Sequence, residues 1–568
     1  MRASAVGKEL KVAAYAGTYV VVLAWDTVDG APPDRVDLLG YAIERTQFDS
    51  GGGEVERYWM RSIKRFKSKD KGLAPGTPVS TADHPIQSFQ WADYTAKAGT
   101  SYEYRVVPVV GTPKNARLDE GAGVKVRITA ESDFGYPKPP GAGEIRHDIF
   151  FNRGVIGSQA YAREFGNKTP DESDPFSPEM KWLSRGLFEA MTNFIGMGKD
   201  GMSLRAVFYE FKYLPVANAF MRAVEAGADV KIVYDGASSY KTENLATIQE
   251  SGLDRHGAVI ARTVSEGIRH NKFIVLMKGK KPVAVLTGST NVSAGGIFGH
   301  SNVGHVVWDK DVAAKYLKYW ESLAANLTPT KLRPLNQKET PTPKNRPPKQ
   351  SVTPLFSARD AKESNDTLAW YAARLAEAKE VSCMTFAFNI DDTFQKIFQE
   401  DNDVLRYIVK DDPLDRETES VGSDRDVIFA AGSYLGEGAL ANFLSERSNP
   451  LNRNRYIHNK FMLVDPLGQD PLVIAGSANF SKPSQRINDE NMLMIRGDLR
   501  VADIYFGEFM RVFDHHYARY VVRVLTQEGK SDPEAGYLKE KSADWLPSHF
   551  APWSYKSKRR RYFCSPKS

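Results

Sequence analysis

One short phrase occurs twice in this chain of 568 residues. The first copy reads Arg269-His270-Asn271-Lys272-Phe273, then Gly288-Ser289-Thr290-Asn291; the second reads Ile457-His458-Asn459-Lys460-Phe461, then Gly476-Ser477-Ala478-Asn479. The chain has only ten histidines, so two of them in matching settings are a strong constraint. The repetition predicts two segments with the same local structure.

Each copy predicts a hairpin whose polar residues meet at one end. Residues i and i+2 of a strand point to the same side. The same-side pairs are His270 with Lys272, Ser289 with Asn291, His458 with Lys460, and Ser477 with Asn479. Imidazole, ammonium, hydroxyl and amide groups together suit a tetrahedral phosphate anion.

The rest of the chain divides into three further patterns. Residues 1–135 read as short strands rich in β-branched and aromatic residues, separated by turns, which predicts an antiparallel sandwich. Residues 145–327 and 355–568 alternate helices with strands and predict two α/β units. Residues 328–354 are rich in proline and basic residues and predict an exposed, extended linker.

Two resemblances follow from these patterns. The first 135 residues resemble a fibronectin type III module, with Trp25 as its core tryptophan and Ala98 to Tyr102 entering a late strand. The H-x-K phrase, an Asp and the later G-S-x-N phrase resemble the phospholipase D superfamily, or HKD phosphodiesterases. That second resemblance implies two α/β repeats packed with pseudo-twofold symmetry around one active site.

The phospholipase D resemblance also implies a mechanism without metal or cofactor. One histidine attacks phosphorus to form a phosphohistidine, while the other protonates the leaving alcohol and later activates water or an acceptor alcohol. Lys272 and Lys460 are expected to bind the non-bridging oxygens. Asn291 and Asn479 add hydrogen bonds, and the two serines shape the pocket.

The two copies differ in their acidic residues. Asp465 and Glu490 follow the second copy, whereas Met277 and Asn302 stand at the corresponding positions of the first. Strand parity places Asp465 away from the histidine face, which predicts a structural role. We expect Glu490 to pair with His458 and favour its protonated form as the general acid, which leaves His270 as the neutral nucleophile.

Three functions are compatible with this site. The leading hypothesis is a phospholipase D-type phosphodiesterase that hydrolyses or transfers a phospholipid phosphodiester. The first alternative is a metal-independent endonuclease acting on nucleic acid, and the second is a non-catalytic phosphate-binding protein. Peripheral membrane contact and a protein partner for the N-terminal module are further expectations.

Charge and cysteine content add weak constraints. The net charge of +6 excludes neither nucleic acid nor anionic lipid, and the two cysteines cannot form a disulfide framework or zinc cluster. No signal sequence or transmembrane run is recognisable, so the cytoplasm is the default and export without a cleavable signal the alternative. The basic run from Lys556 to Arg561 is expected to be a solvated tail. Nearby aromatic residues are expected to cap the active site or to dock this tail.

Overall fold

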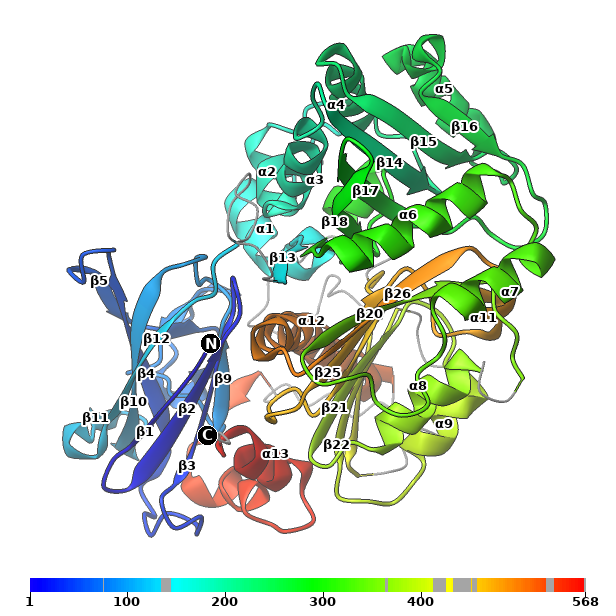
Figure 1. Cartoon of the computed structure of the whole chain (residues 1–568). Coiled ribbons are helices and arrows are strands. Elements are labelled where there is room, and N and C mark those ends of the chain that lie inside the picture. The colour runs from blue at the N-terminus through cyan, green and yellow to red at the C-terminus, as the bar shows by residue number, and fades with distance from the viewer. Residues whose placement is uncertain are drawn as a thin grey trace.

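The computed structural model contains a β-rich module followed by two α/β lobes (Figure 1). It describes residues 1–74, 76–133, 145–362, 366–411, 425–432, 451, 457–527 and 536–565. The Pro-rich stretch at 137–141 lies outside the described residues, as do Arg453 and Arg455 just ahead of the second motif.

The N-terminal module is built from two sheets. The first has the order β1 (Arg2–Val6), β2 (Leu10–Ala16), β3 (Val21–Thr27) and β9 (Gln90–Asp93). The second has the order β11 (Asn115–Leu118), β10 (Ser101–Thr112), β4 (Leu38–Phe48) and β5 (Glu54–Trp59), with β12 (Val124–Thr129) also paired to β10. Trp25 is fully buried and packs edge-on against Tyr41, as expected for a core tryptophan. The more specific resemblance to fibronectin type III stays a prediction.

The first α/β lobe contains a seven-stranded sheet. Its order is β13 (Arg146–Phe151), β19 (Val303–Trp308), β18 (Lys281–Gly288), β17 (Lys272–Lys278), β14 (Met202–Phe208), β15 (Asp229–Asp235) and β16 (Val259–Arg262). Its helices are α1 (Ser158–Phe165), α2 (Pro178–Ser184), α3 (Leu187–Gly196), α4 (Leu214–Glu225), α5 (Lys241–Ser251) and α6 (Lys310–Ala324). Alternate residues of β17 serve different cores: Ile274 packs with α3 and α4, and Phe273 with α6.

The second lobe has a sheet with the same connectivity. Its order is β20 (Ser351–Ser357), β26 (Glu490–Arg496), β25 (Leu472–Gly476), β24 (Phe461–Val464), β21 (Val381–Phe386), β22 (Leu405–Lys410) and β23 (Val427–Ala431). In both sheets the first four pairings are antiparallel and the last two are parallel. The helices α8 (Thr367–Ala376), α9 (Asp392–Phe398), α11 (Lys482–Arg486) and α12 (Leu499–Gln527) complete this lobe.

One continuous core joins all three parts. Helix α12 contributes Tyr505 and Phe509 to a buried cluster that also contains Val275 of the first sheet, Leu463 of the second and Tyr15 of the sandwich. Figure 1 shows α12 between the sandwich and the two lobes. The sandwich is therefore packed firmly against the lobes through buried apolar side chains.

The predicted extended linker is only partly extended. Residues Pro329–Glu339 form helix α7, and β20 begins at Ser351 as an edge strand of the second sheet. Pro329 is compatible with a helix because a proline in the first turn loses no internal hydrogen bond. Leu332 and Asn336 are buried, so this segment packs against the lobes.

The expected solvated C-terminal tail is also wrong. Residues Tyr537–Leu538 form β27, which pairs with β7 (Arg65–Phe66) of the sandwich, and residues Tyr555–Phe563 form helix α13. Arg560 is buried and pairs with Asp26 of the sandwich. Trp545 packs against Tyr41, so the aromatic residues dock this segment.

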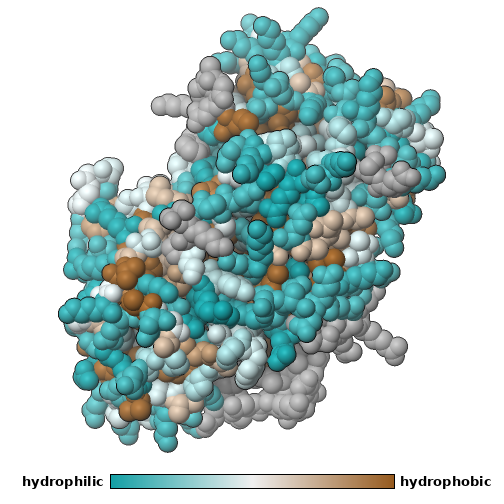
Figure 2. Space-filling view, turned by 60° about the horizontal axis from the view of Figure 1, so that its bottom comes forward, coloured by the Kyte–Doolittle hydropathy of each residue, from teal (hydrophilic) through white to brown (hydrophobic). Residues whose placement is uncertain are grey.

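The face in Figure 2 is largely hydrophilic, with hydrophobic residues in small separate groups. None of the helices in the described part of the chain has the length and apolarity needed to cross a membrane.

Candidate active site

The two repeated motifs meet between the two lobes. His270 precedes β17 and His458 precedes β24, and their ring centroids lie 6.5 Å apart. Both histidines and both lysines are buried. Reacting atoms approach to roughly 3–3.5 Å before reaction, so one phosphoryl group can contact both rings.

Reciprocal backbone contacts hold the motifs together. The backbone N–H of His458 donates to the carbonyl of Ser301 at 3.1 Å, and the N–H of Asp489 donates to the carbonyl of Ile268 at 2.9 Å. Asp489 also accepts two hydrogen bonds from the buried guanidinium of Arg262 in the first lobe. Each histidine is thus placed beside the strand that supplies its partner side chain.

The partner of each histidine comes from the opposite lobe. The Nδ1 atom of His270 lies 2.9 Å from Glu490 Oε2, and the Nδ1 atom of His458 lies 2.9 Å from Asn302 Oδ1. The expected pairing of His458 with Glu490 is therefore wrong. Glu490 is nearer to His458 in the sequence, but β26 carries it across the lobe interface to His270.

The tautomer of His458 follows from the contacts of Asn302. The Asn302 amide donates to the carbonyl of Gly296 at 2.7 Å, which turns its oxygen toward His458. Nδ1 of His458 must then carry the proton that this oxygen accepts. Glu490 presents only acceptors when ionised, so Nδ1 of His270 carries a proton as well. In both neutral rings the lone pair is therefore on Nε2.

Two serines hold these partners in place. The Ser477 hydroxyl donates to Glu490 at 2.6 Å, and the Ser289 hydroxyl donates to Asn302 at 2.7 Å. Each hydroxyl oxygen also accepts a backbone N–H from the neighbouring strand. The serines thus act on the histidines of the opposite lobe, in addition to any effect on pocket shape.

Burial sets the protonation of the site. It lowers the pKa of His270 to about 4, although Glu490 acts in the opposite direction. Burial also lowers the pKa of His458 well below its usual range, and the charges of Lys460 and of nearby His300 and Lys272 add to this effect. Burial thus favours the neutral form of both imidazoles.

The lysine of each motif contacts the backbone of the histidine in the same motif. The ammonium of Lys460 donates to the carbonyl of His458 at 2.7 Å, and Lys272 makes the same contact with His270. Burial lowers the pKa of Lys272 to about 7, against the opposing effects of Glu490 and Glu210. A bound phosphate anion favours the charged form of both lysines.

Asn291 and Asn479 occupy corresponding positions in the two motifs, and the amide oxygen of each is buried. Oδ1 of Asn291 and Oδ1 of Asn479 are buried and have no hydrogen-bond partner among the described residues. The Asn291 amide nitrogen donates to Glu210. Asn291 therefore links the repeated motif to a carboxylate that sequence reasoning missed.

Glu210 belongs to a polar group that follows the end of β14. Its neighbour Tyr209 lies edge-on to His270, with ring centroids 5.2 Å apart. The ammonium of Lys212 lies 3.5 Å from Glu210 and 4.3 Å from the ring centroid of Tyr240. The sequence signal that could have identified these residues is their position directly after a predicted strand of the α/β unit.

Asp465 is a structural residue, as strand parity predicted. Its carboxylate accepts backbone N–H groups from Lys379, Glu380 and Val381, where β21 begins. Met277 fills the corresponding position in the first lobe as part of the core. Neither residue contacts the histidines through any hydrogen bond that the described residues show.

Other histidines take peripheral places. The ring of His300 lies 5.9 Å from that of His458, whereas His305 is buried between His147 and Tyr505. Asp514 accepts a hydrogen bond from Tyr94, consistent with a structural role for the Asp514-His515-His516 run. Across the described ranges, no group of three or more His, Cys, Asp or Glu side chains could hold a metal ion.

Parts of the chain are similar to a known protein family and to solved structures. The model of the family described as "Cardiolipin synthase, PLD-like domain" matches residues 199–324 and 429–515. Curated proteins gave no match. A phosphatidylserine synthase from Haemophilus influenzae Rd KW20 is 12% identical, with a TM-score of 0.41, over 61% of this chain and 91% of that one.

Smaller solved structures align with part of the chain. The phospholipase D family member Nuc from Salmonella typhimurium is 21% identical, with a TM-score of 0.23, over 32% of this chain and 96% of that one. NucT from Helicobacter pylori is 16% identical, with a TM-score of 0.24, over 32% of this chain and 98% of that one. The two segments that match the family model contain both histidine motifs.

Proposed function

We propose that this protein is a phospholipase D-type phosphodiesterase that hydrolyses or transfers a phospholipid phosphodiester. The observation that carries the proposal is the facing pair His270 and His458, each with its Nδ1 fixed by an acceptor from the opposite lobe. This arrangement leaves two Nε2 atoms for one phosphoryl group, with two lysines beside them.

In the proposed first step, Nε2 of His270 attacks phosphorus. The negative charge of the bound phosphodiester favours protonation of His458 on Nε2 by solvent. An N–P bond forms, the ester P–O bond breaks, and protonated His458 gives its Nε2 proton to the departing alcohol. In the second step, neutral His458 takes a proton from water or an acceptor alcohol, whose oxygen attacks phosphorus and releases His270. Lys272 and Lys460 stabilise negative charge on the phosphoryl oxygens.

The carboxylate beside His270 is the reason to assign this histidine as the nucleophile. Burial favours the neutral form of both rings, so it does not distinguish their roles. A ring phosphorylated on Nε2 while Nδ1 keeps its proton is cationic, and only His270 has a carboxylate partner to neutralise that charge. His458 faces an amide and nearby cations, so once protonated it is a strong acid.

Different residues at corresponding positions of the two lobes favour a phospholipid over nucleic acid as the substrate. Glu210 lies two positions after β14, and Phe388 lies two positions after the corresponding strand β21. The Glu210 side chain contacts the site through Asn291, whereas Phe388 is 38% exposed. A carboxylate accepts hydrogen bonds from a hydroxyl or ammonium head group but repels a polyanion, and an exposed ring suits apolar substrate. This difference supports an amphiphilic diester.

The decisive experiment compares both substrate classes. The purified full chain is incubated in EDTA with phosphatidylcholine and phosphatidylglycerol vesicles and, separately, with plasmid DNA. We expect release of head groups without nicking, and loss of that release in His270→Ala and His458→Ala. His256→Ala, at an exposed histidine outside the site, is the matched control.

The other outcomes identify the alternatives. Nicking without head-group release would assign the site to a nuclease. Phosphate binding without turnover of either substrate would assign it to a binding protein.

The domain-level expectations are part of the same proposal. The identical strand orders of the two sheets support a pseudo-twofold pair of lobes. The two-sheet sandwich, with four strands in one sheet and five in the other, supports a fibronectin type III-like module with a spacer or docking role. Contact with a membrane surface follows from a phospholipid substrate.

A further inference from the structure

A buried hydrogen-bonded network links the residue after His270 to the residue after Glu490. Asn271 stands between His270 and Lys272 in the first motif. Its Oδ1 accepts a hydrogen bond from the amide nitrogen of Asn491 at 2.8 Å. Both asparagines are fully buried. The link therefore crosses the lobe interface beside the contact between His270 and Glu490.

Further contacts fix the direction of this link. Oδ1 of Asn491 accepts from the Thr287 hydroxyl at 2.6 Å and from the Tyr316 hydroxyl at 2.9 Å. The amide nitrogen of Asn491 must then face Asn271, whose own amide nitrogen donates to the Tyr319 hydroxyl at 3.1 Å. Burial raises the pKa of both tyrosines, so each remains a donor. Tyr319 donates to a backbone carbonyl at the end of β20, and the network thus allows one orientation of each amide.

Among the described residues, the second motif has no equivalent network. Asn459 stands between His458 and Lys460 and is fully buried, and neither polar atom of its amide has a hydrogen-bond partner in the described part of the chain. When the two motifs are aligned on their histidines, apolar residues or glycine occupy the positions that correspond to the rest of the network. These residues are Val303 for Asn491, Ala475 for Thr287, Ile504 for Tyr316 and Gly507 for Tyr319. The network therefore distinguishes the half-site of His270 from that of His458.

The sandwich packs against α12 where Tyr319 stands on the corresponding helix α6. A side chain at Gly507 of α12 would meet Cβ of Val20 at 3.2 Å. Val20 and Ile504 belong to one buried apolar cluster. The contact with the sandwich thus favours apolar packing beside the second motif, whereas α6 presents hydroxyl groups beside the first.

The link controls the position of two functional groups. The contact of Nδ1 with Glu490 fixes one atom of the His270 ring. The backbone of Asn271 carries His270 on one side and Lys272 on the other, and the Lys272 ammonium donates to the carbonyl of His270. The hydrogen bond from Asn491 therefore sets where both groups stand relative to β26. A displacement of about 1 Å at the reacting atoms costs about a hundredfold in rate.

We propose that Asn271 and Asn491 are positioning residues that hold His270 against Glu490 and opposite His458. Each amide satisfies the other, so the two residues act as one unit, and removal of either should have the same effect as removal of both. The catalytic part of this inference rests on the proposed function, whereas the placement of the His270 ring does not.

Kinetics with a short-chain phosphatidylcholine test the catalytic part in the full chain. Asn271→Leu and Asn491→Leu keep the branching of the side chain and break the link, and Asn459→Leu is the matched change in the second motif. We expect both link-breaking variants, and the double variant, to lower kcat by roughly tenfold to a hundredfold, with KM within about twofold. Asn459→Leu should change kcat by less than about twofold, because its amide has no hydrogen bond to another described residue.

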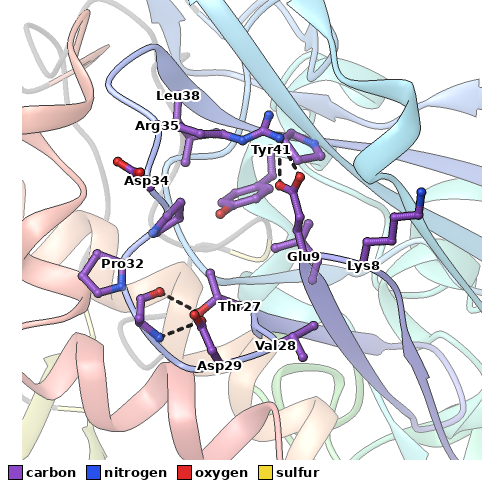
Figure 3. Close-up of a pocket in the computed structure, with 14 residues that line it drawn as sticks. Lys8, Glu9, Thr27, Val28, Asp29, Pro32, Asp34, Arg35, Leu38 and Tyr41 are labelled. Carbon is purple, nitrogen blue, oxygen red and sulfur yellow. Dashed lines mark hydrogen bonds and ion pairs between the residues drawn. The ribbon is translucent and has the colours of Figure 1, made fainter.

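A remote variant controls for loss of stability. Thr27 lies at a cavity of about 590 Å³ in the sandwich (Figure 3), and its buried hydroxyl donates to the carbonyl of Ala31 at 2.7 Å. Thr27→Val removes this hydrogen bond outside both lobes. We expect it to lower the urea midpoint of unfolding while kcat stays within about twofold. If kcat instead followed the urea midpoint in all of these variants, the network would be merely structural and the inference overturned.

Nuclear magnetic resonance tests the placement of the ring without any substrate. The chain is labelled at the ring nitrogens of histidine, and the Nδ1 proton of His270 is identified by its absence from His270→Ala. Glu490 holds this proton in the unaltered protein and slows its exchange with solvent. We expect faster exchange in Asn271→Leu and Asn491→Leu, and an unchanged rate in Asn459→Leu.

The two measurements separate this inference from the proposed function. If the unaltered protein does not turn over the phospholipid, the proposed function fails, and the proton-exchange rates still decide whether the asparagines position His270. Unchanged exchange in Asn271→Leu would overturn the inference. A double variant whose loss of kcat equals the product of the two single losses would also overturn it, because the residues would then act independently.

Discussion

Glu490→Gln tests the cross-lobe pairing most directly. The change keeps the side-chain volume and removes a fully buried negative charge 2.9 Å from His270 Nδ1. The Ser477 hydroxyl can accept from the new amide group, which leaves the amide oxygen facing the histidine. The tautomer of His270 is thus preserved, and the lost quantity is the attraction between the carboxylate and the cationic ring.

The magnitude follows from Coulomb's law. Opposite unit charges about 4 Å apart attract by about 4 kcal/mol at an effective dielectric constant of about 20. The remaining neutral hydrogen bond offsets about 1 kcal/mol of this loss. A net loss of about 3 kcal/mol in the transition state slows phosphoenzyme formation by about two orders of magnitude. KM should change little, since the charge develops only during reaction.

Two substrates separate the roles of the histidines. Rates are measured by rapid quench with a short-chain phosphatidylcholine and with a phosphodiester that releases nitrophenol. His458→Ala should recover much of its first-step rate with the nitrophenol ester, which needs no protonation to leave. Glu490→Gln should remain slow with both, because attack by His270 is impaired. Rescue of Glu490→Gln by the nitrophenol ester, or a loss below fivefold, would refute this reasoning.

Three further predictions concern stability. Asp465→Ala removes the acceptor for three backbone N–H groups and should lower the free energy of unfolding by about 1–3 kcal/mol in urea titration, with kcat of the folded enzyme within twofold; a large loss of kcat would contradict its structural role. Asp26→Asn leaves Arg560 buried without its carboxylate and should cost about 3–5 kcal/mol by the same measurement, so a neutral result would show that this pair does not hold the C-terminal segment. His549 has a folded pKa of about 3, below its unfolded value, so the unfolded chain binds its proton first and stability falls as pH drops from about 6.5 toward 3. His549→Asn should reduce the slope of unfolding free energy against pH by at most about 1.4 kcal/mol per unit, and an unchanged slope would contradict the lowered pKa.

Local sequence patterns predicted which side chains lie together at the site better than how those side chains are paired. The period-two spacing of His270 and Lys272 correctly indicated side chains that converge, and Asp465 was correctly separated from them by parity. The predicted pairing of His458 with Glu490 was wrong because no local sequence pattern shows which lobe the end of a strand will face. That choice depends on packing between two sheets, which places Glu490 and Asn302 across the interface.

Composition misled where tertiary contacts override it. Proline and basic residues at 328–354 suggested an extended linker, yet buried Leu332 holds a helix there. The basic run from Lys556 to Arg561 suggested a solvated tail, yet Arg560 finds Asp26 across most of the chain length. In both cases the compensating partner lies far away in sequence, where residue counts give no information.

The contact between the two ends of the chain also fixes an order of events during synthesis. Trp545 and Leu546 belong to the buried core of the sandwich, and β27 pairs with β7. A ribosome makes the sandwich strands before both lobes and makes these residues after them, so the core of the sandwich is completed only once the two lobes have been synthesised. A chain that stops short of residue 545 should therefore expose apolar surface at its beginning, far from the truncation itself.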